Sequence, residues 1–249
     1  MSRFFSPPEN VKGDKIFIKG KEAHHLLKVM RLKGGDEVVV FDGQGKGYQG
    51  VITEERKKLA VVKILSEKKL KRLEEPRVTL AQALPARGKM DYLVEKVTEL
   101  GVDEIIPLET KRSVVKINKG KAELTRRRWE KIAISASKQC GRLKLPVISR
   151  IIKFPQALGK ASEFDLVLFP CLSFKAVSLK KVLEDGGKIK KVLVFIGPEG
   201  GFSQEEIKQA ELIGCKLVTL GSNVLKSDTA AMAMLSIIKM TASNKKKRC

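Results

Sequence analysis

Short apolar runs separated by glycine-containing turns open the chain, at residues 15–18, 37–41, 50–52 and 59–62. Runs of this length and spacing are typical of β-strands joined by tight turns. The pattern predicts a small N-terminal β-barrel.

A helix is predicted inside this strand-rich region. Its buried face has apolar residues at helical spacing, namely Ala23, Leu26, Leu27 and Met30. The outer face is predicted to be basic, with His24, His25, Lys28 and Arg31.

A highly charged segment, residues 66–76, follows the last of these runs and ends at Pro76. This composition is typical of a surface connection between domains. We place the domain boundary within it, which gives an N-terminal domain of residues 1–72 and a C-terminal domain of residues 73–249.

Beyond the boundary, strand-like apolar runs alternate with helical patterns. The runs are residues 78–84, 104–108, 165–169, 192–196 and 216–220. Such alternation indicates an α/β domain with a parallel sheet. The best-defined helix covers residues 90–100 and ends at Gly101.

A second helix has a predicted buried side formed by Trp129, Ile132, Ala133, Ala136 and Cys140. We interpret Cys140 as a small packing residue rather than a nucleophile. The helix begins with the basic run Arg126, Arg127 and Arg128. This run either faces solvent or forms part of an RNA track.

Two glycine-rich segments resemble ligand-binding loops. Residues 45–50 contain a GxGxxG pattern, but both flanks look like strands, whereas a dinucleotide fingerprint opens a helix. We therefore predict a glycine-rich hairpin there. Residues 197–202 directly follow an apolar strand and precede a helix capped by Ser203 and Glu206. Because ligands bind at this end of parallel strands, and glycines let the backbone approach them, we predict a binding loop rather than a plain turn.

A further loop, residues 220–229, also lies between a strand and a helix, where Ser227 or Asp228 can form the helix cap. Residues 230–238 are apolar nearly all round, which predicts burial on every side. The last helix is therefore either central in the core or half of a subunit interface.

The charge of the chain indicates a partner. Lys and Arg number 50 against 28 Asp and Glu, which gives a net charge of +22. Such an excess favours a polyanionic partner, RNA or DNA. Thermophilic adaptation explains it poorly, because that adaptation enriches Glu together with Lys.

Other residue types exclude further classes of protein. No apolar run approaches the ~20 residues of a spanning helix, and the N-terminus has no signal-peptide core, so a cytoplasmic protein is expected. The four cysteines form no CxxC pair, and the only two histidines are adjacent. We expect free thiols and no metal site.

Short segments along the whole chain resemble one family. They include Arg31-Leu32-Lys33, Gln82-Ala83-Leu84, Lys89-Met90-Asp91, Glu95-Lys96, Thr98-Glu99-Leu100-Gly101, Arg112-Ser113-Val114, Arg128-Trp129, residues 197–202, and Leu220-Gly221 leading to Thr229-Ala230. The chain thereby resembles the small-subunit ribosomal RNA uridine-N3 methyltransferases, the RsmE-like family of the SPOUT class. The resemblance implies an RNA-binding PUA-like β-barrel and a SPOUT-type α/β methyltransferase domain with a deep trefoil knot. It also implies a homodimer that methylates ring nitrogen 3 of a uridine in 16S ribosomal RNA.

The resemblance further implies S-adenosyl-L-methionine as cofactor. The residues expected to hold it are Phe169, Pro170, Ile196, Gly197, Pro198, Glu199, Gly200, Gly201, Phe202, Leu220, Gly221, Leu225, Thr229 and Ala230. The chain departs from the family at Asn223, Lys226 and Asp228, where arginine, arginine and glutamate are common. A lysine lacks the bidentate geometry of an arginine.

The implied reaction needs a proton acceptor and a cation beside the uracil ring. The candidates are Asp228 as acceptor, although it is equally suited to cap a helix, and Arg142 or Lys226 as cation. The candidate RNA contacts are Arg31, Arg112, Arg126, Arg127 and Arg142. Three alternatives stay open: methylation of another RNA site, a non-catalytic RNA-binding protein, and a nucleotide-dependent enzyme of Rossmann type.

Overall fold

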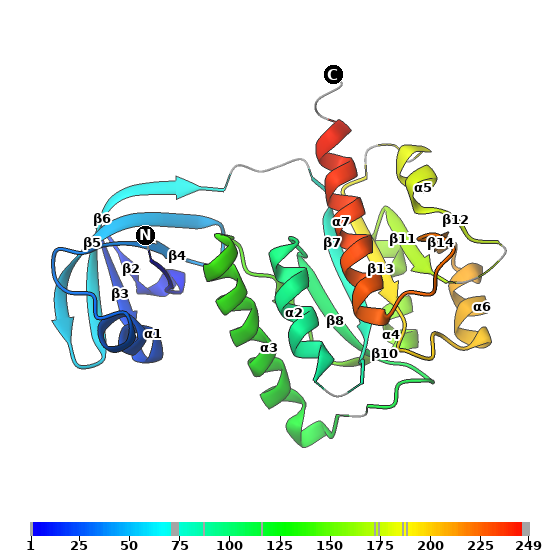
Figure 1. The fold of residues 1–249 in the computed structure, drawn as a ribbon, viewed down its shortest axis with the longest axis horizontal. Helices are drawn as coiled ribbons and strands as arrows, with labels where there is room; N and C mark the ends of the chain where they lie inside the picture. Colours follow the sequence, from blue (N-terminus) through cyan, green and yellow to red (C-terminus); the bar gives the residue numbers. More distant parts are fainter. Residues whose placement is uncertain are drawn as a thin grey trace. The chain divides into compact units, whose positions relative to one another are not determined.

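The computed structural model describes residues 2–70, 75–86, 88–115, 117–171, 173, 175–185, 187 and 189–245. The chain divides into two compact units. The first contains Met1–Arg72 and Ile134–Leu145, and the second contains Leu73–Ala133 and Pro146–Cys249. Each unit is built around its own sheet (Figure 1).

The first unit contains a six-stranded sheet with the order β1-β4-β5-β6-β3-β2. Its strands are β1 (Arg3–Phe5), β2 (Val11–Lys12), β3 (Lys15–Lys19), β4 (Glu37–Phe41), β5 (Lys46–Arg56) and β6 (Leu59–Lys69). All neighbours are antiparallel except β1 and β4. The four predicted strands are confirmed. Ser66 belongs to β6 and pairs with Gln49 of β5, and β6 continues to Lys69. The predicted start of the surface connection at residue 66 is therefore wrong.

Short helical segments complete this unit. They are η1 (Pro8–Asn10), α1 (Gly20–His24) and η2 (His25–Val29), of which η2 is a π-helical turn. Ala23 and Leu26 are fully buried, as predicted, but Met30 is 43% exposed. Its predicted burial is wrong because the π-turn changes the helical period and the helical conformation ends before Arg31, whose φ is +55°.

The GxGxxG pattern lies in the β4–β5 hairpin, which confirms that interpretation. Gly45 precedes β5, while Gly47 and Gly50 lie within it. A Cβ on Gly50 would lie 2.4 Å from the carbonyl oxygen of Lys63, at the point where the β5–β6 register shifts. The glycine therefore serves strand packing and opens no helix.

The second unit contains an eight-stranded sheet in which every pair is parallel, as the alternating pattern predicts. Its order is β10-β8-β7-β13-β11-β14-β12, and β9 pairs with β8. The strands are β7 (Arg77–Ala83), β8 (Glu104–Glu109), β9 (Val147–Ile148), β10 (Ile152–Lys153), β11 (Leu166–Pro170), β12 (Val177–Ser178), β13 (Lys191–Ile196) and β14 (Lys216–Thr219).

Helices cover both faces of this parallel sheet. They are α2 (Lys89–Glu99), α3 (Lys119–Cys140), α4 (Phe154–Leu158), η3 (Ala161–Glu163), α5 (Leu179–Asp185), α6 (Gln204–Leu212) and α7 (Ser227–Lys245). One apolar cluster joins the sheet to α2, α5, α7 and the part of α3 around Trp129. A second cluster joins it to α4 and α6. Helices α2 and α7 lie side by side (Figure 1).

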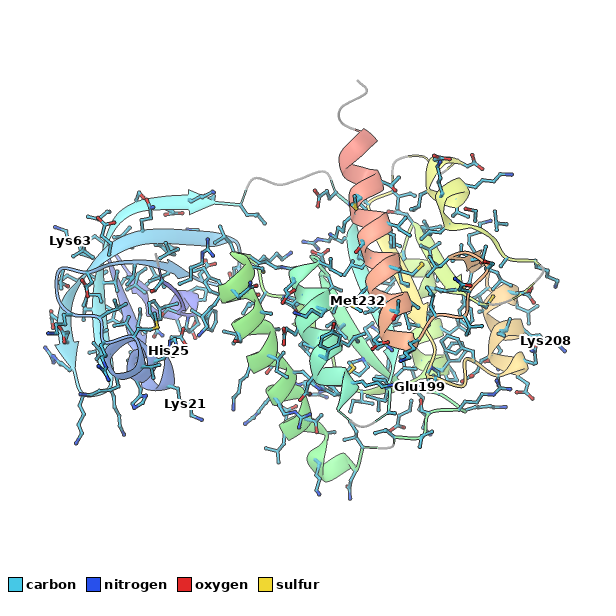
Figure 2. All side chains as sticks on the ribbon, in the orientation of Figure 1. Lys21, His25, Lys63, Glu199, Lys208 and Met232 are labelled. Carbon is cyan, nitrogen blue, oxygen red and sulfur yellow. The ribbon has the colours of Figure 1, made fainter. Side chains whose placement is uncertain are left out.

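Two predicted helix faces differ from the structure. Among the α7 side chains that the structure describes, residues 227–241, one stripe is fully buried, and it is formed by Ala231, Met234, Leu235 and Ile238. Met232 on the same helix is partly exposed, so burial on every side is wrong for the single chain (Figure 2). Cys140 is exposed rather than packed, because it is the last residue of α3, beyond the buried Ala136.

Candidate functional site

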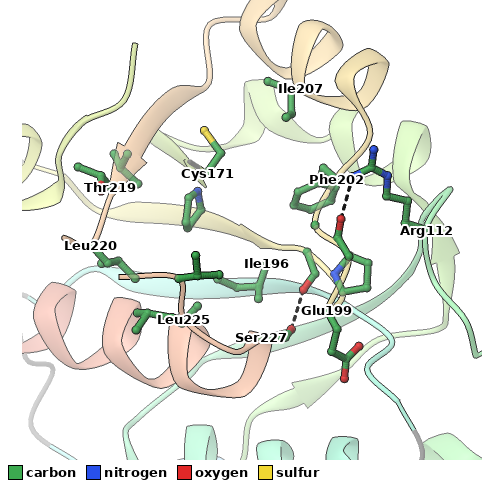
Figure 3. A pocket seen from close by; sticks show the side chains of 18 of the residues that line it. Arg112, Cys171, Ile196, Glu199, Phe202, Ile207, Thr219, Leu220, Leu225 and Ser227 are labelled. Carbon is green, nitrogen blue, oxygen red and sulfur yellow. Dashed lines mark hydrogen bonds between the residues drawn. The ribbon is translucent and has the colours of Figure 1, made fainter. Parts of the chain in front are cut away.

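A cavity of about 390 Å³ lies at the carboxyl ends of β11, β13 and β14 (Figure 3). Both predicted loops contribute to its wall. The lining residues are Arg112, Pro170, Cys171, Ile196, Gly197, Pro198, Glu199, Gly200, Gly201, Phe202, Gln204, Ile207, Val218, Thr219, Leu220, Gly221, Asn223, Val224, Leu225, Ser227 and Ala230. This volume falls within the ~300–1,000 Å³ that small-molecule sites occupy.

The glycine loop, residues 197–202, is tightly folded. Gly201 has a φ of +66°, and its N–H donates a hydrogen bond to the carbonyl of Pro198 at 2.8 Å. A Cβ on Gly197 would lie 3.1 Å from the Phe202 ring. That ring packs against Phe169, with centroids 4.4 Å apart. The loop therefore presents backbone to the cavity and anchors itself through an aromatic side chain.

Glu199 ties the glycine loop to the segment that precedes α2. Its carboxylate accepts hydrogen bonds from the N–H of Ala86 at 3.0 Å and from Nζ of Lys89 at 3.1 Å. Burial raises the pKa of Glu199, but hydrogen bonds from its own backbone, from Ala86 and from Lys89 outweigh this effect. The net pKa is therefore lowered, and the group stays an anionic anchor at neutral pH.

A third segment, residues 110–113, is fastened to the same loop. Nη1 of Arg112 donates to the carbonyl of Gly200 at 2.8 Å. The N–H of Lys111 donates to the buried carboxylate of Glu206 at 2.9 Å, and that carboxylate also accepts the N–H of Ser203 at 2.8 Å. Glu206 and Ser203 thus form the predicted capping box of α6. These bonds hold the Arg112 guanidinium at the cavity wall (Figure 3).

The second loop closes the opposite side of the cavity. Gly221 has a φ of +124°, a conformation that favours glycine, and its N–H donates to the hydroxyl of Thr219 at 3.2 Å. At the start of α7, the hydroxyl of Ser227 donates to the carbonyl of Gly197 at 2.6 Å (Figure 3). The two loops are therefore joined directly.

Most residues expected to hold the cofactor line this one cavity. The exceptions are Phe169, which is fully buried beneath Phe202, and Thr229, which is exposed on α7. Sequence reasoning placed Arg112 among the RNA contacts and did not assign Cys171, Gln204, Ile207, Val218, Thr219, Asn223, Val224 or Ser227 to the cofactor site. Cys171 directly follows β11 and Thr219 ends β14, so their places at strand ends were a signal that could have found them.

The two candidate catalytic residues lie in different units. Asp228 is in the first turn of α7, where its carboxylate accepts the N–H of Thr229 at 2.9 Å, and it does not line the cavity. Arg142 belongs to the first unit, where its Nε donates to the carbonyl of Lys144. Neither unit by itself therefore contains both candidate catalytic side chains.

The candidate RNA-contact arginines have different surroundings. Arg31 is exposed, at the turn that follows η2. Arg126 and Arg127 donate to the carboxylate of Glu123 on the same helix, at 2.8 and 3.1 Å. Hydrogen bonds from these arginines lower the pKa of Glu123 to about 2. Part of the basic run of α3 is thus neutralised within the helix.

Within the described residues, no helix combines the length and hydropathy that crossing a membrane requires.

Comparisons with known proteins match both parts of the chain. A family model described as an RNA methyltransferase domain matches residues 73–239, and one described as an RNA methyltransferase PUA domain matches residues 18–65. Ribosomal RNA small subunit methyltransferase E of Bacillus subtilis is 30% identical over 89% of this chain and 88% of its own length. The Mesomycoplasma hyopneumoniae protein of the same name is 30% identical over 95% of this chain and 98% of its own.

Solved structures give the same result. A methyltransferase from Legionella pneumophila, solved with S-adenosylmethionine bound, is 31% identical, covers 96% of both chains and superposes with a TM-score of 0.85. Ribosomal RNA small subunit methyltransferase E from Neisseria gonorrhoeae, bound to S-adenosylmethionine, is 29% identical over 96% of this chain and 97% of its own, also with a TM-score of 0.85. The N-terminal unit is PUA-like, and the parallel-sheet unit is an RNA methyltransferase domain.

Proposed function

Since the chain belongs to the ribosomal RNA small subunit methyltransferase E family, we propose that it methylates ring nitrogen 3 of a uridine in 16S ribosomal RNA with S-adenosylmethionine. The observation that carries this proposal is the cavity formed by the two loops at the strand ends. The similar proteins that were solved with S-adenosylmethionine support the choice of cofactor.

The cavity has the properties that this cofactor requires. Ile196 and Leu225 offer apolar wall for an adenine ring, while the glycine loop offers backbone polar groups. Ile196 to Phe202, Pro170, Leu220, Gly221, Leu225 and Ala230 would hold the cofactor, with Phe169 supporting them from below. The bound cofactor would supply an electrophilic methyl group on a sulfonium.

This chain would contribute positioning and a route for one proton. We assign the Asp228 carboxylate as the acceptor of the proton on ring nitrogen 3, which leaves the ring negatively charged. The electron pair of that nitrogen would then form the bond to the methyl carbon as the carbon–sulfur bond of the sulfonium breaks and leaves a neutral thioether. Arg142 or Lys226 would stabilise the negative charge of the deprotonated ring. Ring nitrogen 3 lies on the pairing edge of uridine, so the target has to be unpaired when it enters the site.

The assembly is also part of the proposal. We assign RNA binding to residues 1–72, with the exposed Arg31 as a phosphate contact, and to Arg112, Arg126, Arg127 and Arg142. We assign methyl transfer to residues 73–249, with the trefoil knot that the family resemblance implies. A homodimer would cover the partly exposed side of α7, including Met232 and the 66% exposed Met240.

The test is direct. Ribosomal RNA from a strain that lacks this protein is digested and analysed by mass spectrometry, and N3-methyluridine should be absent and return on complementation. An Asp228→Asn variant should bind S-adenosylmethionine normally but fail to restore the modification. A modification missing elsewhere in the RNA would replace the proposed target, and no affinity of the purified protein for S-adenosylmethionine would refute the methyltransferase itself.

A further inference from the structure

A buried polar chain lies behind the wall of the cavity. Gln82, near the end of β7, is fully buried and does not line the cavity. Its Nε2 donates two hydrogen bonds, to the carbonyl of Ala83 at 2.8 Å and to the hydroxyl of Ser227 at 2.9 Å. Since a backbone carbonyl can only accept, the bond to Ala83 fixes which end of the amide faces Ser227.

The direction of this chain continues into the glycine loop. A hydroxyl has one proton, and that of Ser227 goes to the carbonyl of Gly197 at 2.6 Å. The donors therefore run in one sense, from the Gln82 amide to the Ser227 hydroxyl to the Gly197 carbonyl. Bonds arranged in this way polarise and strengthen one another in a low-dielectric interior. They join the end of β7, the start of the glycine loop and the start of α7.

Burying the Gln82 amide in the core lowers the stability of the fold. Its Oε1 has no hydrogen-bond partner among the described residues, although the atom is buried. A buried polar atom left unpaired costs stability, so an apolar side chain of similar length would suit packing better. What the amide provides is a donor that keeps the Ser227 hydroxyl turned toward Gly197.

We propose that Gln82 is a positioning residue of the cofactor site, which it reaches through Ser227. By fixing the hydroxyl of Ser227, it holds the glycine loop in its binding conformation before any ligand arrives. This inference deepens the proposed function and, where affinity for S-adenosylmethionine is concerned, rests on it. Preorganisation of this kind increases affinity by reducing the ordering that binding requires.

The test compares three variants of the full-length protein. Gln82→Met removes the donors at similar side-chain length, and Ser227→Ala removes the link while leaving Gln82. Thr79→Val is the matched control: Thr79 is a buried polar residue of the same strand, and its hydroxyl donates to Glu104 rather than to the loop. Should Gln82→Met fail to fold, Ser227→Ala carries the test alone.

The first measurement, made without ligand, is hydrogen exchange of the backbone N–H groups of residue 197 and residues 199–202, which include the N–H that Gly201 donates to Pro198. Exchange should accelerate about three- to tenfold in Gln82→Met and Ser227→Ala, the effect expected for one net hydrogen bond, and stay at the wild-type rate in Thr79→Val. The affinity for S-adenosylmethionine should fall by a similar factor. The variant that combines Gln82→Met with Ser227→Ala should lose no more affinity or loop protection than Ser227→Ala alone, because Gln82 acts through the Ser227 hydroxyl.

The outcomes separate the two ideas. Wild-type loop exchange in a folded Gln82→Met variant would overturn the positioning role of Gln82, and wild-type loop exchange in Ser227→Ala would overturn the link through that hydroxyl, whatever the cofactor. Faster loop exchange in a protein that has no affinity for S-adenosylmethionine would support the positioning role and refute the proposed function.

Discussion

Alanine at Gly197 should disturb the glycine loop, whereas alanine at Gly200 should not. A Cβ on Gly197 would lie 3.1 Å from Cδ2 of Phe202 and 3.3 Å from the Cα and carbonyl carbon of Gly201. The Phe202 ring cannot retreat, because ring centroids of Phe169 and Phe154 lie 4.4 and 5.4 Å from it. Gly201 is backbone of the same loop, so it can yield only if the loop moves.

The magnitude follows from this packing. Forcing a methyl group into a close-packed site costs about 1–3 kcal/mol. The cost should appear as lower unfolding free energy, as weaker cofactor binding, or as both, with about tenfold in Kd for each ~1.4 kcal/mol. A Cβ on Gly200 would meet Arg112 at an ordinary 3.7 Å, and Gly200 has no positive φ. Gly200→Ala should therefore be neutral or stabilise by up to about 1 kcal/mol, because it restricts the unfolded chain.

Two measurements check this pair. Urea unfolding can be followed through the buried Trp129, which is the only tryptophan of the chain, and binding of S-adenosylmethionine can be measured by calorimetry. The free energy of unfolding and the free energy of S-adenosylmethionine binding, added together, should be about 1–3 kcal/mol less favourable for Gly197→Ala than for Gly200→Ala. Equal unfolding midpoints and equal affinities would refute the idea that Gly197 is fixed by lack of space.

Three further predictions concern other parts of the chain. Burial raises the pKa of Cys171, and it raises the pKa of Cys215 from 9.0 to about 11. The contribution of the neutral Cys215 thiol to the free energy of unfolding should therefore be complete below pH 9.0 and should be lost as the pH rises toward 11. In pulsed alkylation at pH 8, read by mass spectrometry, the exposed Cys140 should react before Cys171 and Cys215, and equal rates for these three described cysteines would contradict this burial. Met240→Glu should weaken self-association in sedimentation without lowering the unfolding free energy, since Met240 is 66% exposed. A wild-type protein that is monomeric at micromolar concentration would show that α7 forms no subunit interface. Arg31→Gln should lower the log-log salt slope of RNA binding by about one unit and leave cofactor affinity unchanged, and an unaltered slope would exclude Arg31 as a phosphate contact.

The local pattern of the sequence determined the elements and the loops. Alternating apolar runs and helical stripes predicted the parallel sheet, because these periods depend only on residues a few positions apart. The capping box of Ser203 and Glu206 is equally local and is present as predicted. The loops at residues 197–202 and 220–229 could be assigned to one site, since the carboxyl ends of parallel strands meet at one edge of a sheet.

Only the tertiary structure decided which distant side chains complete that site. Arg112 and Gly200 are 88 positions apart, and Gln82 and Ser227 are 145 positions apart, yet each pair is hydrogen-bonded. They meet because the sheet order places β8, β7 and β13 in succession, so that the segments after these strands lie at one edge, and because α7 packs against β7 and β13. Periodicity reports the face on which a residue lies but not which distant segment will cover that face. For the same reason it could not show that the Gln82 amide stands behind the glycine loop.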